Sequence, residues 1–140
     1  MTGAGVGPPH PDDDPTWSPA EKRAADYLRD QRGYRVTGGG PTDRGRHYDL
    51  TLNPHGPADV KTLGPGSHSG TMRNEASASV RKGGQGRTLV CDVRQAGIDG
   101  SEARRGVQRI RGLFGPSGAE GHKLDRVIVI GDAFCLEEVL

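Results

Sequence analysis

Three charged residues near the middle of the chain have the types and the spacing of a hydrolytic centre: Asp49, Asp59 and Lys61. They lie in two segments, residues 48–52 and 58–62, that alternate apolar and polar side chains around a turn rich in proline and glycine. This pattern predicts a β-hairpin. Because successive side chains of a strand point to opposite faces, one face of the hairpin is wholly apolar and the other gathers the three charges.

Two chemical interpretations of this charged face are open. A symmetric five-residue turn places Leu50 opposite Val60. It also places Asp49 opposite Lys61, an ordinary cross-strand ion pair worth about 0.2–1 kcal/mol. The second acid, Asp59, favours another interpretation, because neighbouring carboxylates repel unless a cation lies between them. Two carboxylates and a lysine can hold a divalent ion with a water beside it, the minimum for metal-assisted attack on a phosphodiester.

The segment before the hairpin begins with an N-terminal helix signal. Ser18 supplies a capping hydroxyl, a proline follows it, and Glu21 stands at the third helical position, which together form a capping box. We expect the helix to end at Gly33, a typical C-cap residue. Glu21 therefore has a structural explanation. Its spacing from Ala24 and Leu28 nevertheless places it on the inward stripe of the helix, where it can point at the sheet.

The rest of the pattern predicts alternating strands and helices. Strands are expected over residues 34–37, 88–94 and 127–130, and helices over residues 71–82 and 101–113. Three consecutive glycines are expected to end the first of these strands. The resulting order, α-β-β-β-α-β-α-β, fits an α/β (α+β) domain in which helices flank a mixed central sheet.

The composition indicates one small globular domain behind a leader. The chain has 140 residues, 23 glycines, 10 prolines and a formal net charge of +1, so its poor apolar content is not combined with the charge excess of a disordered chain. Residues 1–17 are expected to be a flexible leader or linker, and residues 18–140 the domain. No apolar run is long enough to cross a bilayer, no signal peptide is expected, and the two cysteines lack zinc-binding spacing.

The positive charge is concentrated in the middle of the domain. Between residues 44 and 111 there are twelve Lys and Arg but six Asp and Glu. This excess favours an anionic partner such as nucleic acid, and a solvated basic face explains it equally well. Four arginines are expected on the solvated polar face of the helix over residues 101–113, with RNA contact as the alternative: Arg104, Arg105, Arg109 and Arg111.

The charged hairpin resembles a known nuclease signature. Asp49 followed by Asp59-Val60-Lys61 is similar to the D…(D/E)-x-K pattern of the PD-(D/E)xK nuclease superfamily. Glu21 matches the acid that such nucleases often carry on the preceding helix. The chain departs from the superfamily name in having a tyrosine directly before Asp49, where the name implies proline.

A wider resemblance covers roughly residues 18–136. The stretches GGQGRTLVCDVRQAGI (83–98) and LDRVIVIGDAF (124–134), with the helix between them, resemble the C-terminal toxin domains of contact-dependent growth inhibition proteins that cleave tRNA. One difference is an extra glycine at Gly83-Gly84, after the helix that precedes the first stretch. The resemblance implies a restriction-endonuclease-like core.

The resemblance also implies a role for each matched residue. Asp49 and Asp59 would ligate a divalent metal ion, Mg²⁺ with Mn²⁺ or Zn²⁺ as alternatives, and Glu21 would complete the shell directly or through water. Lys61 would position or deprotonate the attacking water, or stabilise the charge of the phosphorane. Four residues would contact the substrate backbone, the alternative being solvated residues at a helix end and turn: Arg81, Lys82, Gln85 and Arg87.

The implied function is that of a metal-dependent endoribonuclease toxin. Such a domain would be part of an exported protein, would cleave tRNA in the cytoplasm of the target bacterium, and would be neutralised by a cognate immunity protein, with no small-molecule cofactor. A DNA endonuclease of the same superfamily and a non-catalytic nucleic-acid-binding module are the alternatives. The six aromatic residues argue against stacking on several splayed bases and favour recognition of shape and backbone.

Overall fold

The computed structural model describes residues 7–41, 47–81, 87–114, 118 and 123–140. In chain order its elements are α1 (Pro19–Arg32), β1 (Arg35–Pro41), β2 (His47–Asn53), β3 (Gly56–Thr62), α2 (Ser69–Arg81), β4 (Thr88–Asp92), α3 (Gly100–Phe114), β5 (Arg126–Ile130) and β6 (Cys135–Val139). None of the helices in these residues has both the length and the apolar character needed to cross a membrane.

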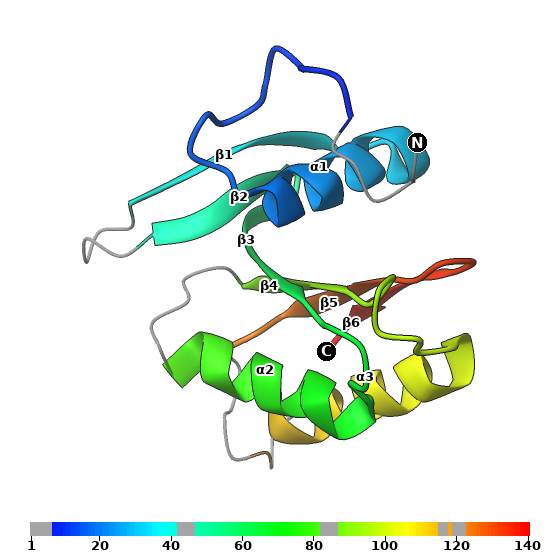
Figure 1. The fold of residues 1–140 in the computed structure, drawn as a ribbon. Coiled ribbons are helices and arrows are strands. Elements are labelled where there is room, and N and C mark those ends of the chain that lie inside the picture. Colours follow the sequence, from blue (N-terminus) through cyan, green and yellow to red (C-terminus); the bar gives the residue numbers. More distant parts are fainter. Residues whose placement is uncertain (1–6, 42–46, 82–86, 115–117, 119–122) are drawn as a thin grey trace.

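The strands within the described ranges form one mixed sheet in the order β1-β2-β3-β4-β5-β6. β1, β2 and β3 are antiparallel neighbours, β3, β4 and β5 are parallel, and β6 returns antiparallel to β5. Figure 1 shows α1 on one side of this sheet and α2 and α3 on the other. The predicted α/β (α+β) class, with helices flanking a mixed sheet, is therefore confirmed.

Each face of the sheet has its own apolar core. Under α1 lie the hairpin residues predicted to share the apolar face, together with three buried residues of the helix: Leu50, Leu52, Ala58, Val60, Ala24, Ala25 and Leu28. Under α2 and α3 lie alternate residues of β4 and β5 and the inward stripe of α3: Leu89, Cys91, Val127, Val129, Ala103, Val107, Ile110 and Phe114. The period of two along the central strands thus divides their side chains between the two cores.

The hairpin keeps its predicted faces but not its predicted register. Leu50 pairs with Ala58 rather than with Val60, because the strands continue further into the turn than a symmetric five-residue loop allows. A shift of two residues leaves every side chain on its own face, whereas a shift of one would reverse them. Asp49 is consequently not opposite Lys61, and it lies beyond the last residue pair of the β2–β3 ladder.

β1 is longer than predicted because it runs through the three glycines rather than ending before them. The reason is the close approach of β2. A Cβ atom on Gly39 would lie 1.9 Å from the carbonyl oxygen of Tyr48 and 2.8 Å from that of Asp49, a spacing that only a residue without a side chain permits. Here glycine is a packing requirement of the strand and not a signal for its end.

The sequence pattern also fails to predict β6. This strand has a partner on one side only, and its residues are half-buried or exposed, with two consecutive glutamates near its end. An edge strand with one neighbour does not need the apolar alternation that identifies a strand with a buried face. The antiparallel pairing with β5 identifies these residues as a strand, which their sequence pattern does not.

Substitution of Gly39 tests the close approach of β1 to β2. We expect Gly39→Ala to lower the free energy of unfolding by about 1–3 kcal/mol, because the new methyl group collides with backbone atoms that cannot turn aside. Urea unfolding followed by circular dichroism measures the change. The matched control is Gly64→Ala, where the added Cβ meets nothing within 4 Å. Equal urea midpoints for the two variants would contradict the packing requirement.

Candidate functional site

The candidate site lies where β2 and β3 separate. β3 pairs with β2 over Gly56–Ala58 and with β4 over Ala58–Thr62, so it changes partners midway along its length. At this fork the backbone N–H of Val60 donates a 2.7 Å hydrogen bond to Oδ2 of Asp49. A side-chain carboxylate therefore satisfies a backbone donor beyond the end of the β2–β3 ladder.

Asp49 lies among other carboxylates. Burial is the largest cause of a pKa of Asp49 that is raised to about 6. A hydrogen bond shared with the carboxyl of Glu21 and the charges of Glu21 and Asp59 also raise this pKa, whereas the Val60 N–H lowers it. Burial together with two acidic neighbours thus makes the Asp49 carboxyl easier to protonate, and the site is short of positive charge.

Glu21 caps α1 and also lies near Asp49. It completes the capping box of α1, in which its Oε1 accepts a 2.7 Å hydrogen bond from the Ser18 N–H and its own N–H donates to Oγ of Ser18 at 3.1 Å. The same carboxyl reaches Asp49 across the gap between α1 and β2. The cap is thus confirmed, and metal ligation by Glu21 stays a prediction.

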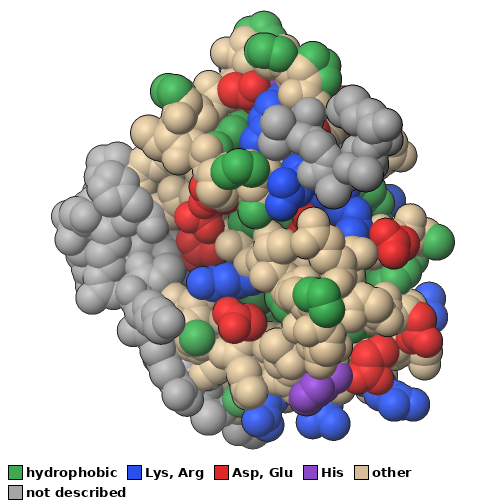
Figure 2. All heavy atoms as spheres, in the orientation of Figure 1, with side chains coloured by type: hydrophobic (Ala, Val, Ile, Leu, Met, Phe, Trp, Pro, Cys, Tyr) green, Lys and Arg blue, Asp and Glu red, His purple; other side chains and the backbone are tan. Residues whose placement is uncertain are grey.

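Asp59 and Lys61 lie on the face of β3 that α2 covers. Their partners in β4, Leu89 and Cys91, belong to the core beneath α2 and α3. Asp59 is only 6% exposed and accepts a 3.4 Å hydrogen bond from Oγ of Ser79 on α2. Lys61 is partly buried. Figure 2 shows acidic and basic side chains side by side on the surface between the α1 layer and the α2 layer.

α2 contributes a further acid that the sequence pattern does not indicate. Burial raises the pKa of the Cys91 thiol to about 12, with the charges of Glu75 and Asp92 adding to the rise. The charge of Lys61 opposes it. Glu75 and Lys61 therefore both lie close enough to Cys91 for their charges to change its pKa. The thiol itself stays protonated, which excludes Cys91 as a nucleophile.

The residues predicted to contact substrate are only partly visible. Lys82 and Gln85 lie outside the described residues, and Arg81 is the last residue of α2, with a side chain that also lies outside them. The guanidinium of Arg87 donates two hydrogen bonds to the exposed carboxylate of Asp125, at 2.6 and 2.8 Å. Substrate contact by these four residues stays a prediction.

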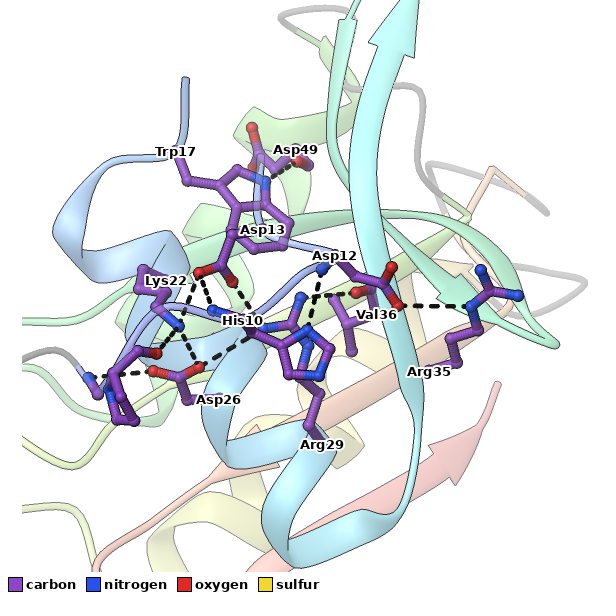
Figure 3. Close-up of polar contacts among 12 residues, drawn as sticks. His10, Asp12, Asp13, Trp17, Lys22, Asp26, Arg29, Arg35, Val36 and Asp49 are labelled. Carbon is purple, nitrogen blue, oxygen red and sulfur yellow. Dashed lines mark hydrogen bonds and ion pairs between the residues drawn. The ribbon is translucent and has the colours of Figure 1, made fainter. Parts of the chain in front are cut away.

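The segment expected to be a flexible leader contributes to the site. Its residues 7–17 lie against α1 and β1, as Figure 3 shows. Asp13 forms ion pairs with Lys22 at 3.0 Å and Arg29 at 2.7 Å. Burial raises the pKa of Asp13, but the hydrogen bonds from Arg29, from the His10 N–H and from Lys22 hold it well below its usual range. The part of the leader that the structure describes is therefore fastened to the domain.

Trp17 connects this segment to the carboxylates. Its indole Nε1 donates a 2.8 Å hydrogen bond to the backbone oxygen of Asp49, which Figure 3 shows. The guanidinium of Arg29 lies 5.5 Å from the centre of the indole ring and covers it. The only tryptophan of the chain thus fixes the backbone of the residue whose carboxylate occupies the fork. A lone tryptophan at the end of a polar segment is the signal that could have identified it.

A cavity of about 570 Å³ opens beside these groups. Its walls are the end of the leader, the start of α1, the glycines of β1 and the start of β2: Asp14, Thr16, Trp17, Glu21, Gly39, Gly40, Tyr48 and Asp49. We call it the Trp17 pocket. Glu21 and Asp49 are the two members that sequence reasoning identifies.

The chemistry of the carboxylates suits a divalent cation. Glu21 and Asp59 are both near enough to Asp49 to raise its pKa, so a cation between these carboxylates would relieve their repulsion. Among the residues that the structure describes, no three His, Cys, Asp or Glu side chains come together as a ready metal site. The side chains present thus fit the predicted ion in type, and a closed shell would need them to rotate or to bind through water.

Comparison with known proteins supports the fold. No protein family and no curated protein matches this chain. Among solved structures, the chain is similar to one chain of a CdiA-CT/CdiI toxin and immunity complex from Burkholderia pseudomallei, with 18% sequence identity and a TM-score of 0.60. The match covers 94% of this chain and 96% of the other. At this identity the likeness establishes a shared fold.

The raised pKa of Asp49 predicts how stability depends on pH without metal. The folded state holds the proton more tightly than the unfolded state does, so this contribution to the free energy of unfolding is complete below about pH 4 and is lost as the pH rises through about 6. Solvent screening at this partly exposed site limits the loss to about 1 kcal/mol. Asp49→Asn should abolish this loss, because an amide keeps an acceptor for Val60 without the charge.

Thermal unfolding between pH 4 and 8 in EDTA measures this dependence. The control is Asp30→Asn on the exposed side of α1, which should keep the pH dependence of the wild type. A wild-type pH profile in the Asp49→Asn variant would contradict the electrostatic account of the site.

Proposed function

We propose that this chain is a toxin domain that hydrolyses phosphodiester bonds in tRNA with the help of a divalent metal ion. The observation that carries the proposal is the gathering of acids at the fork beside a cavity, where burial and the neighbouring Glu21 and Asp59 raise the pKa of Asp49 to about 6. Perturbed carboxyl groups beside a cavity are typical of catalytic sites. A purely structural ion pair would lower the pKa of its acid.

Asp49 and Asp59 would hold the metal ion, with Glu21 as the third acid. A bound divalent ion would supply Lewis-acid stabilisation of the phosphoryl oxygens and would lower the pKa of a coordinated water. The protein contributes order to the ligands. The Val60 N–H fixes one oxygen of Asp49, and Ser79 contacts Asp59 from α2, so each carboxylate has a protein contact of its own before substrate arrives.

Lys61 would act on the water and on the developing charge. It lies two residues after Asp59 on the same face of β3, so its ammonium group can reach the space beside that carboxylate. A lysine donates hydrogen bonds and carries one positive charge, which stabilises the extra negative charge of a pentacoordinate phosphorus in the transition state.

The basic surface of the domain supports a nucleic-acid substrate. Arg104, Arg105 and Arg109 are exposed on α3, as predicted for its polar face. Arg105 lies 3.4 Å from Glu102, a contact that a solvated pair can exchange for a phosphate. The few aromatic side chains favour a folded RNA over a long single strand. These features support tRNA and leave a DNA endonuclease as the outcome to be tested against it.

The toxin part of the proposal rests on the structural neighbour. The chain shares nearly its whole fold with a chain from a toxin and immunity complex. By analogy we propose that it is delivered into a target bacterium and that a cognate immunity protein neutralises it in the producing cell.

Cleavage assays with and without Lys61 test the proposed activity. Wild-type protein and Lys61→Ala are incubated with total bacterial tRNA and with plasmid DNA, in Mg²⁺, in Mn²⁺ and in EDTA. We expect discrete tRNA fragments with the wild type, their absence in EDTA, and cleavage by Lys61→Ala that is at least about 100-fold slower. Thermal unfolding of both proteins establishes that the variant is folded.

Arg73→Ala is the matched control, because Arg73 is an exposed cation on α2 away from the fork. It should cleave at the rate of the wild type. Cleavage of plasmid DNA with intact tRNA would identify a DNA endonuclease instead. Intact RNA and DNA under every condition would contradict catalysis and favour the nucleic-acid-binding module.

A further inference from the structure

The Trp17 pocket has the size and lining of a small-molecule site. Its volume of about 570 Å³ lies within the roughly 300–1,000 Å³ that such sites occupy. Trp17 and Tyr48 supply aromatic surface, and Gly39 and Gly40 supply a wall without side chains. A flat ring can approach a glycine backbone more closely than it can approach any other residue.

The wall formed by the leader is fixed in place. The N–H of Trp17 donates to the backbone oxygen of Asp14 at 3.1 Å, and the indole donates to Asp49. Arg29 covers the indole and donates to the backbone oxygen of Val36 in β1 at 2.7 Å. The pocket is therefore built before any ligand enters, which reduces the entropy that binding must overcome.

The charges of the lining limit the ligand. Asp14, Glu21 and Asp49 all line the pocket, and no lysine or arginine does so among the described residues. Such a lining repels phosphate and attracts groups that donate hydrogen bonds. Together with the aromatic surface, it suits an uncharged ring that carries amino groups at its edge.

Asp14 offers the acceptor for such a group. Its Oδ1 accepts hydrogen bonds from the N–H of Thr16 at 2.8 Å and from the hydroxyl of Thr16 at 2.7 Å. These bonds hold the carboxylate in one orientation. The other oxygen, Oδ2, accepts no hydrogen bond from a described residue and lies beside Gly38 of β1, where an added Cβ would come within 2.7 Å of it.

We infer that the Trp17 pocket binds the nucleobase of a nucleotide next to the cleaved phosphate, and that Asp14 makes it prefer a base with an exocyclic amino group. The inference rests on the proposed function, since the pocket ends at the carboxylates Glu21 and Asp49. The amino group of cytosine, adenine or guanine donates to Oδ2 of Asp14. Uracil presents its one ring N–H between two carbonyl oxygens, which a carboxylate repels. One base enters the pocket, in keeping with the few aromatic residues of the chain.

The indole N–H of Trp17 provides a direct probe. The chain has one tryptophan, so a ¹H–¹⁵N spectrum contains a single indole resonance, and this N–H lies at the pocket wall. Cytidine and uridine are the matched ligands, because they differ at the ring edge and carry no phosphate. We expect cytidine to shift the indole resonance with an affinity about tenfold higher than that of uridine. Equal affinities, or no shift with either nucleoside, would overturn the inference.

Two variants assign the preference to Asp14. In Asp14→Asn the amide oxygen can keep the bonds from Thr16 while the amide nitrogen replaces Oδ2, so the preference should change towards uridine, whose carbonyl oxygens accept. Tyr27→Ala, which removes a ring outside this pocket, should leave both affinities unchanged. An unaltered preference for cytidine in Asp14→Asn would overturn the role of Asp14.

The same titration separates this inference from the proposed function. Nucleoside binding needs neither metal nor Lys61, so Lys61→Ala should bind cytidine like the wild type in EDTA. Binding without any cleavage would contradict only the nuclease proposal. Cleavage without nucleoside binding would overturn only the base pocket.

Discussion

The fork between β2 and β3 organises the site, and the hydrogen bond from the Val60 N–H to Asp49 is the contact that closes it. Where two strands separate, a backbone donor loses its ladder partner, and an unsatisfied buried N–H is costly. The carboxylate of Asp49 accepts the hydrogen bond of this N–H, but it also brings negative charge to a partly buried position. The glycines of β1 and the indole of Trp17 then hold the backbone of Asp49 from its other side.

The repulsion among the acids at the fork lowers the stability of the folded protein. A structural carboxylate would be surrounded by donors and cations, yet Asp49 has Glu21 and Asp59 as neighbours, and its pKa rises. The fold tolerates this repulsion because its two apolar cores and the ion pairs of the leader supply stability elsewhere. Sites that destabilise the folded protein are where function is expected.

The sequence predicts the parts of this structure that depend on local rules. Alternation in the hairpin assigns the faces of Asp49 and Lys61, and the capping box places Glu21. It does not predict what tertiary contacts decide. The β2–β3 register follows from how far the strands continue into the turn, and glycines that look like a strand end serve instead to let two strands approach. The sequence does not identify Trp17 as a site residue, because its contact with the site is a hydrogen bond to Asp49, 32 positions away.

We propose that the acids at the fork form a divalent-cation site. A crystal of the protein soaked in Mn²⁺ and measured at a wavelength where manganese scatters anomalously tests it most directly. The account predicts an anomalous peak between the carboxylates of Asp49 and Asp59, with Glu21 bound to it directly or through water. Full Mn²⁺ soaking without a peak at the fork, or with peaks only elsewhere on the surface, would contradict it.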